Sequence, residues 1–148
     1  MKYFKPEEFN GWYDLLAPAL KSNLDDLRTK WGQPIVISPV EGAVGRHDGK
    51  GGTSQHNVDR WGEVRAVDVM PHGIETANDA RRFRQLAEDC GFTGIGFYPD
   101  WNLRPGFHVD IRINENERYV AQWGGIRRNG EQVYVGIETA IWKLPAMA

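Results

Sequence analysis

Residues 39–57 cannot form a helix or a regular strand, because glycine recurs through this segment with polar residues between. The glycines are Gly42, Gly45, Gly49, Gly51 and Gly52. The segment is therefore predicted to be a long loop. Long ordered loops in compact domains usually carry function, so functional residues are expected in or beside this loop.

Two stretches of the chain have helical spacing. Apolar residues from Phe9 to Trp31 recur at steps of one, three and four, and Pro18 is expected to divide this stretch into two helical pieces or to kink it. A second helix is predicted over residues 76–90, ended by Gly91. Helices therefore both precede the loop and follow it.

Short runs with β-branched residues or strict alternation predict strands at residues 33–38, 65–70, 93–98 and 106–113. The last two runs are predicted to pair as a hairpin, and residues 118–123 and 132–142 are predicted to be further strand or short helix. This order of elements predicts a single α+β domain over residues 1–148, with a small, largely antiparallel sheet and helices packed on it.

Composition excludes several classes of protein. A formal net charge of -2 over 148 residues gives no reason to expect a nucleic-acid partner, which usually requires a basic surface. The single cysteine, Cys90, excludes an intrachain disulfide and a cysteine-rich zinc site. No apolar run approaches the ~20 residues of a membrane span, and the first residues lack the apolar core of a secretory signal. We therefore expect no membrane partner and no secretion signal.

Three residues suggest a metal site. His56 ends the glycine-rich loop, Asp68 lies on the next strand, and His108 lies on a later strand. Two imidazoles and one carboxylate are a common ligand set for a catalytic zinc ion, with the fourth position left to water. Alternation along both strands places Asp68 and His108 on one face of a sheet. The alternative is a solvated loop histidine and an aspartate that accepts a hydrogen bond from the backbone or from Arg65.

Four segments, in their order and spacing, resemble the zinc D-Ala-D-Ala carboxypeptidase family, which includes phage endolysins and shares its fold with the hedgehog signalling domain. Residues 51–56 carry a Gly-Gly and a Ser-x-His pattern, residues 66–69 an Ala-x-Asp pattern, and residues 107–112 a His-x-Asp-x-Arg pattern. The remaining segment is Gly-Ile-Gly-Phe-Tyr-Pro at residues 94–99. The opening segment and Trp123 extend the resemblance over residues 3 to 123. The resemblance implies a hedgehog-like fold, zinc held by His56, Asp68 and His108, and hydrolysis of a peptide bond in bacterial peptidoglycan.

The chain departs from the family pattern between its first two zinc ligands and after its first strand. Eleven residues separate His56 from Asp68, more than is usual, so residues 58–63 are interpreted as an insertion that forms a small lid or hairpin beside the metal. Residues 40–41 are Val-Glu where the family often has an arginine. The nearest substitute is Arg46, as a ligand for the substrate's carbonyl oxygen or carboxylate or, equally, as a solvated loop residue.

A third departure concerns the general base. The acidic residue that members carry three positions before the last histidine is replaced by Pro105. Asp100 is the first substitute, because its loop leads into the strand of His108, although an aspartate after Pro99 is also typical of a turn. The other candidates are Glu41, His47, Asp48 and Glu63.

Four further residues are assigned around the expected metal. Asp110 shares a face with His108 and is expected to orient an imidazole or to pair with Arg112. Trp61, Trp101 and Glu63 lie in polar segments that flank the metal and are candidates to line a substrate groove. Either tryptophan could equally pack onto the scaffold.

The combined expectation is a zinc peptidase that cleaves peptidoglycan stem peptides, working as a monomer. By analogy with the family, it is phage-encoded, is made in the host cytoplasm, and acts on the wall as an endolysin or as part of a virion. Pro105 favours an alternative, a zinc-binding phage tail or wall-recognition module that has lost its base. A third possibility is that no metal binds and the histidines are structural.

Overall fold

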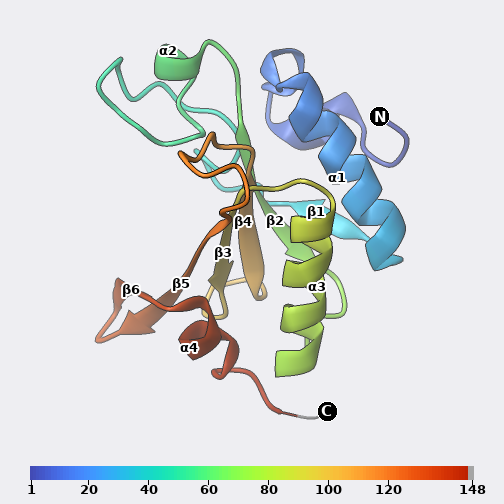
Figure 1. Cartoon of the computed structure of the whole chain (residues 1–148), viewed down its shortest axis with the longest axis vertical. Helices are drawn as coiled ribbons and strands as arrows, with labels where there is room; N and C mark the ends of the chain where they lie inside the picture. Colours follow the sequence, from blue (N-terminus) through green and yellow to red (C-terminus); the bar gives the residue numbers. More distant parts are fainter. Residues whose placement is uncertain (147–148) are drawn as a thin grey trace.

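A six-stranded sheet forms the centre of the computed structural model, which describes residues 1–146, and its strands follow the order β1-β2-β4-β3-β5-β6 (Figure 1). The strands are β1 (Ile35–Ile37), β2 (Ala66–Pro71), β3 (Gly94–Tyr98), β4 (Gly106–Asp110), β5 (Ala121–Arg128) and β6 (Glu131–Val135). All neighbours are antiparallel except β3 and β5, which are parallel. The predicted α+β class with a largely antiparallel sheet is confirmed, as is the β3–β4 hairpin.

Helices α1 (Pro18–Trp31) and α3 (Ala77–Asp89) lie together along one face of the sheet, and α4 (Ile137–Ile141) covers β3 and β5 (Figure 1). Proline suits the first turn of α1 because that position needs no amide hydrogen, and Gly32 ends the helix in the left-handed conformation. The segment predicted to be helical before Pro18 forms only two short 3-10 turns, Pro6–Phe9 and Tyr13–Leu15. Asn10 and Gly11 both have positive φ angles, which interrupt a right-handed helix.

Residues 118–123 and 132–142, which were predicted to be strand or short helix, contain both kinds of structure. Residues 132–142 contain part of β6 and all of α4, while β5 runs further than the expected end at residue 123. The insertion at residues 58–63 forms a helical turn, α2 (Val58–Trp61), so the hairpin alternative is wrong. The side chain of Asn57 accepts a hydrogen bond from the amide of Asp59, and this contact starts the turn.

Alternation along the central strands gives the sheet two chemically different faces. Phe97 of β3 and Phe107 of β4 point toward the helices, where Phe107 contacts Phe83 of α3 at a ring-centroid distance of 4.6 Å. All three phenylalanines are fully buried. Asp68 and His108, one position out of phase with the core residues, point to the opposite face.

Glycines make room on that opposite face for large side chains. A Cβ atom at Gly96 would lie 2.5 Å from Nε1 of Trp123, well inside contact distance. A Cβ atom at Gly106 would collide with the ring of Trp101, and one at Gly94 with the carboxylate of Asp110. The indoles and the carboxylate therefore lie directly over the backbone of the sheet. Among the described residues, no helix has the length and apolar composition needed to cross a membrane.

Replacement of Gly96 by alanine should lower the free energy of unfolding by about 1–3 kcal/mol, because the added methyl group displaces the indole of Trp123. Urea denaturation measures this change. The matched control is Gly51→Ala, where no atom lies within 4 Å of the added group, and its expected effect is within about 0.5 kcal/mol. Equal stability of the two variants would contradict the packing described here.

Candidate metal centre

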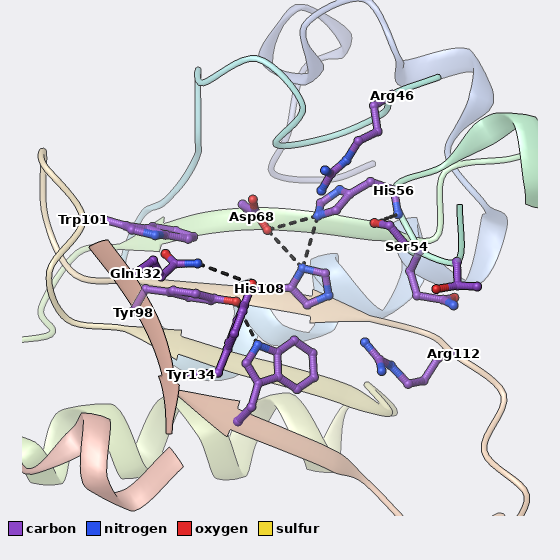
Figure 2. Close-up of a pocket in the computed structure, with 13 residues that line it drawn as sticks. Arg46, Ser54, His56, Asp68, Tyr98, Trp101, His108, Arg112, Gln132 and Tyr134 are labelled. Atoms are coloured by element: carbon purple, nitrogen blue, oxygen red, sulfur yellow. Dashed lines mark hydrogen bonds and ion pairs between the residues drawn. The ribbon is translucent and has the colours of Figure 1, made fainter. Parts of the chain in front are cut away.

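His56, Asp68 and His108 meet at the floor of an open cleft (Figure 2). Oδ1 of Asp68 lies 3.3 Å from Nε2 of His56 and 3.1 Å from Nδ1 of His108. The two imidazole nitrogens are 3.2 Å apart. Three potential ligand atoms thus form a nearly equilateral triangle, and the three residues lie close enough to hold a metal ion.

Two of these residues are positioned by strand pairing. Asp68 on β2 lies directly opposite His108 on β4, so the antiparallel register sets their approach. His56 comes from the end of the glycine-rich loop, where its carbonyl oxygen accepts a hydrogen bond of 3.1 Å from the amide of Arg46. The amide of Val58 returns a bond of 3.0 Å to the carbonyl of Arg46, which fixes the backbone on both sides of His56.

The fully buried side chain of Asn57 organises the glycine-rich loop. Its amide group donates to the carbonyl oxygens of Gly49 and Gly52, and its oxygen accepts from the amides of Asp48 and Asp59. This one side chain therefore satisfies four backbone groups of a segment without regular structure. The loop is held in a defined shape next to His56.

Each imidazole is held by a second contact that decides which nitrogen faces Asp68. Nδ1 of His56 lies 2.7 Å from the carbonyl oxygen of Val44, which can only accept, so this nitrogen carries the hydrogen. Nε2 of His108 lies 2.7 Å from Oδ2 of Asp110 and donates to it. In the neutral rings, Nε2 of His56 and Nδ1 of His108 are then lone-pair donors directed at the same point as the carboxylate.

The pKa values of these groups reflect burial and their close contacts. Burial alone would raise the pKa of Asp68, but its close contacts with His108 and His56 outweigh burial and lower the pKa to about 2. Burial would lower the pKa of His108, but hydrogen bonds to Asp110 and Asp68 raise it to about 9. Without a metal, the His108 imidazole therefore carries a proton at neutral pH, held between two carboxylates.

Asp110 is completely buried and contacts both partners that the sequence suggested. It accepts from His108, and its Oδ1 accepts from Nε of Arg112 at 2.9 Å. Burial opposes ionisation, but the hydrogen bonds from His108 and Arg112 hold the pKa of Asp110 far below its usual range. The guanidinium of Arg112 also lies over the ring of Trp123, 4.8 Å from its centre. Asp110 therefore links the imidazole of His108 to the guanidinium of Arg112.

The cleft above the three residues has a volume of about 750 Å³. Arg46 and Arg112 bring positive charge to its lining, and aromatic surface comes from Tyr98, Trp101, Trp123 and Tyr134 (Figure 2). Of the other residues assigned from sequence, Arg46 and Trp101 therefore lie beside the three candidate metal ligands. Trp101 stacks on Tyr98 at a centroid distance of 4.8 Å and an interplanar angle of 13°.

Asp100 does not line the cleft. Its Oδ2 instead accepts a hydrogen bond of 2.8 Å from the amide of Arg127, near the end of β5. The structure therefore does not bring this carboxylate to the metal ligands.

Glu63 and Trp61 also point elsewhere. Glu63 accepts a hydrogen bond of 3.0 Å from Nε of Arg65. The indole of Trp61 donates to the carbonyl of Ser54 at 2.9 Å, and Arg65 covers its ring. Trp61 therefore stabilises the glycine-rich loop at Ser54 and does not line the cleft.

The remaining acid–base candidates lie on the other side of Arg46. Glu41, His47 and Asp48 line a separate cavity there, and His47 pairs with Asp59 at 2.7 Å. Within residues 1–146, Asp68 is the only carboxylate that lines the cleft.

Sequence reasoning did not assign Tyr98, Gln132 or Tyr134 to the site. The two-residue repeat of β3 could have predicted Tyr98 as a site residue, since it places Tyr98 on the same face of the sheet as Gly94 and Gly96. Gln132 and Tyr134 reach the cleft because β6 pairs with β5, and nothing local to residues 131–135 shows which strand they join. The assignment of Tyr134 required the complete sheet.

Replacement of Asp110 by asparagine should weaken metal binding about 10–100-fold, because His108 loses the charged acceptor that fixes its orientation and basicity. Isothermal titration calorimetry with Zn²⁺ measures the affinity. Asp100→Asn is the matched control, because its carboxylate contacts neither imidazole, and wild-type affinity is expected. An unchanged affinity in Asp110→Asn would contradict the orienting role.

Metal affinity should rise about tenfold per pH unit from neutral pH to about pH 9 and level off above it. A raised pKa means that His108 holds a proton throughout this range, and a metal must displace that proton. Calorimetry in buffers of different ionisation enthalpy should accordingly show about one proton released per metal bound near neutral pH. Affinity that is independent of pH, with no proton released, would contradict this linkage.

The chain was compared with models of protein families, with curated proteins and with solved structures, and none of them matches it. The functional interpretation therefore depends on the residues and geometry of this chain. The observation that requires explanation is a triangle of one carboxylate and two imidazole atoms at the floor of a charged, aromatic cleft.

Proposed function

We propose that the protein is a zinc-dependent peptidase that hydrolyses a peptide bond in the stem peptides of bacterial peptidoglycan. One observation carries the proposal: Nε2 of His56, Nδ1 of His108 and Oδ1 of Asp68 converge on one point that faces an open cleft. Catalytic zinc sites use three protein ligands and leave one position accessible, whereas structural sites are closed by a fourth protein ligand.

The spacing of the three atoms suits zinc. Ligand atoms ~2.0–2.1 Å from a tetrahedral metal lie ~3.3 Å from one another. The three separations here are 3.1, 3.2 and 3.3 Å. Imidazole nitrogen with a single carboxylate also favours zinc over calcium or magnesium, which prefer shells built from oxygen.

Zinc bound by these residues supplies a Lewis acid that polarises a carbonyl group and lowers the pKa of water. Asp110 keeps the hydrogen of His108 on Nε2 and so keeps Nδ1 available as a ligand. The side chain of Arg46 is half exposed, and its one ion pair within residues 1–146 is with Asp48, at 3.5 Å, so a substrate carboxylate or carbonyl oxygen can compete for it. A cleft with two arginines suits stem peptides, which carry free carboxylates.

The aromatic lining supports a polymeric substrate. Trp101 lies beside the ligands, stacked on the buried ring of Tyr98, and Tyr134 is two-thirds exposed at the edge of the cleft. Flat aromatic surfaces contact the apolar faces of sugars and small side chains with little loss of side-chain entropy. A cleft that is open to solvent admits a segment of a longer chain.

A second function is favoured by a specific observation. Pro105 occupies the position of the usual acidic base, and within residues 1–146 no carboxylate besides the ligand Asp68 lines the cleft. A positioned base typically contributes ~10²–10⁴-fold to the rate of such a reaction. The alternative is therefore a zinc-binding wall-recognition module, such as a phage tail component, that binds the stem peptide without cleaving it.

Wild-type protein should carry about one zinc per chain and release new amino groups from purified peptidoglycan. A His56→Ala, His108→Ala double variant should lose both properties, because only Asp68 remains as a ligand. Elemental analysis and labelling of released amino groups measure the two effects, and circular dichroism checks the fold. His72→Ala is the matched control, since His72 does not line the cleft, and it should behave as wild type.

The same experiment separates the two candidate functions. Zinc without release, together with zinc-dependent sedimentation of the protein with peptidoglycan, would replace the peptidase by the recognition module. Absence of zinc in the wild type, with no uptake on addition, would contradict both functions and leave the histidines as structural residues.

A further inference from the structure

Tyr98 is a cleft residue that no step described so far uses. It ends β3, is 92% buried, and yet contributes to the lining of the cleft. Its ring lies between the stacked indole of Trp101 and the backbone of β5, where a Cβ atom at Gly125 would lie 2.5 Å from Cε1. The ring has little freedom to move, so its hydroxyl group has a defined position.

The hydroxyl oxygen of Tyr98 already has one partner. Nε1 of Trp123 donates a hydrogen bond of 2.8 Å to it, and an indole N–H can only donate. The tyrosine oxygen is therefore an acceptor in this pair, and its own hydrogen must point elsewhere. Among the hydrogen bonds of residues 1–146, none uses that hydrogen, and Figure 2 shows the hydroxyl end of Tyr98 directed toward His108.

The pair of Tyr98 and Trp123 lies next to the metal ligands. The ring of Trp123 is 5.2 Å from the ring of His108, measured between centroids. Tyr98 stands opposite Gly106 in the β3–β4 hairpin, two positions from His108 on β4. Gly96, opposite His108 on β3, has no side chain to come between the imidazole and the indole.

The hydroxyl group of Tyr98 is also protonated, as a hydrogen-bond donor must be. Burial, with smaller contributions from Tyr134 and Asp68, outweighs the hydrogen bond from Trp123 and raises the pKa of Tyr98 to about 12. The phenol therefore stays neutral over the whole physiological range. It keeps its hydrogen available for a hydrogen bond and is excluded as a general base.

We propose that Tyr98 is a catalytic residue whose hydroxyl group donates a hydrogen bond to the carbonyl oxygen of the scissile peptide bond. This oxygen gains negative charge as water adds to the carbonyl carbon, and it loses that charge when the carbon–nitrogen bond breaks and the departing amine takes up the proton that the water gave up. The hydrogen stays on Tyr98 throughout, so no proton is gained or lost by the residue. Trp123 is a positioning residue that occupies a lone pair of the tyrosine oxygen and so turns its hydrogen toward the cleft. The inference rests on the proposed peptidase function.

The first test is Tyr98→Phe, which removes the donor and keeps the ring. With soluble peptidoglycan fragments as substrate, kcat should fall about 10²–10³-fold while KM changes little, because the contact strengthens only as charge develops. Zinc content and the thermal unfolding midpoint should stay close to wild type. Tyr119→Phe, an exposed tyrosine outside the cleft, is the matched control and should retain wild-type kcat.

A double-mutant cycle tests the role of Trp123. Trp123→Phe should lower kcat less than Tyr98→Phe does, and it should have no further effect when Tyr98 is already phenylalanine. Additive losses would mean that Trp123 acts by another route. In the metal-free protein, the indole N–H of Trp123 should exchange slowly with solvent by NMR and exchange faster in Tyr98→Phe, independently of activity.

The outcomes distinguish this inference from the function on which it rests. Wild-type protein that binds zinc and releases no amino groups would overturn the peptidase proposal and the role of Tyr98 with it. Active wild type with an equally active Tyr98→Phe variant would overturn the role of Tyr98 alone. If Tyr98→Phe does not fold, the kcat of Trp123→Phe is the deciding measurement. An unchanged kcat in that variant overturns the inference.

Discussion

The contact between Asp68 on β2 and His108 on β4 is the interaction on which the rest of the site depends. Antiparallel pairing sets these residues directly opposite each other, so their approach is fixed by backbone hydrogen bonds instead of flexible side-chain torsions. His56 then needs only to be brought over this pair, and the loop organised by Asn57 does so. A site built on two central strands is held more firmly than one built on loops alone.

This arrangement concentrates charge where solvent is largely excluded. Asp68 and Asp110 stay ionised because His108 and Arg112 donate hydrogen bonds to them, and neither carboxylate would be stable at this burial alone. The same contacts hold His108 protonated when no metal is present. A metal ion held by these residues would replace that proton, so the cluster would keep a positive charge between its carboxylates in either state.

Local patterns predicted a large part of this structure. Period-two alternation predicted β2 and placed Asp68 and His108 on one face of the sheet. Helical spacing of apolar residues, with Gly91 as the stop, placed α3 within a residue at each end. Two expectations were wrong for local reasons as well. The positive φ angles of Asn10 and Gly11 end the helical pattern before Pro18, and Asn57 starts a helical turn where a hairpin was one alternative.

The amino-acid sequence by itself determined the residue types and faces of the metal cluster, because these follow from chemistry and from the two-residue repeat of a strand. Tertiary structure decided which other residues join the cluster. The parallel pairing of β3 with β5 brings Trp123 to Tyr98, and the hydrogen bond from Arg127 draws Asp100 away from the cleft. Each of these two hydrogen bonds joins residues more than 20 positions apart in the sequence. No local pattern specifies which distant strand will lie next to a given strand in the sheet.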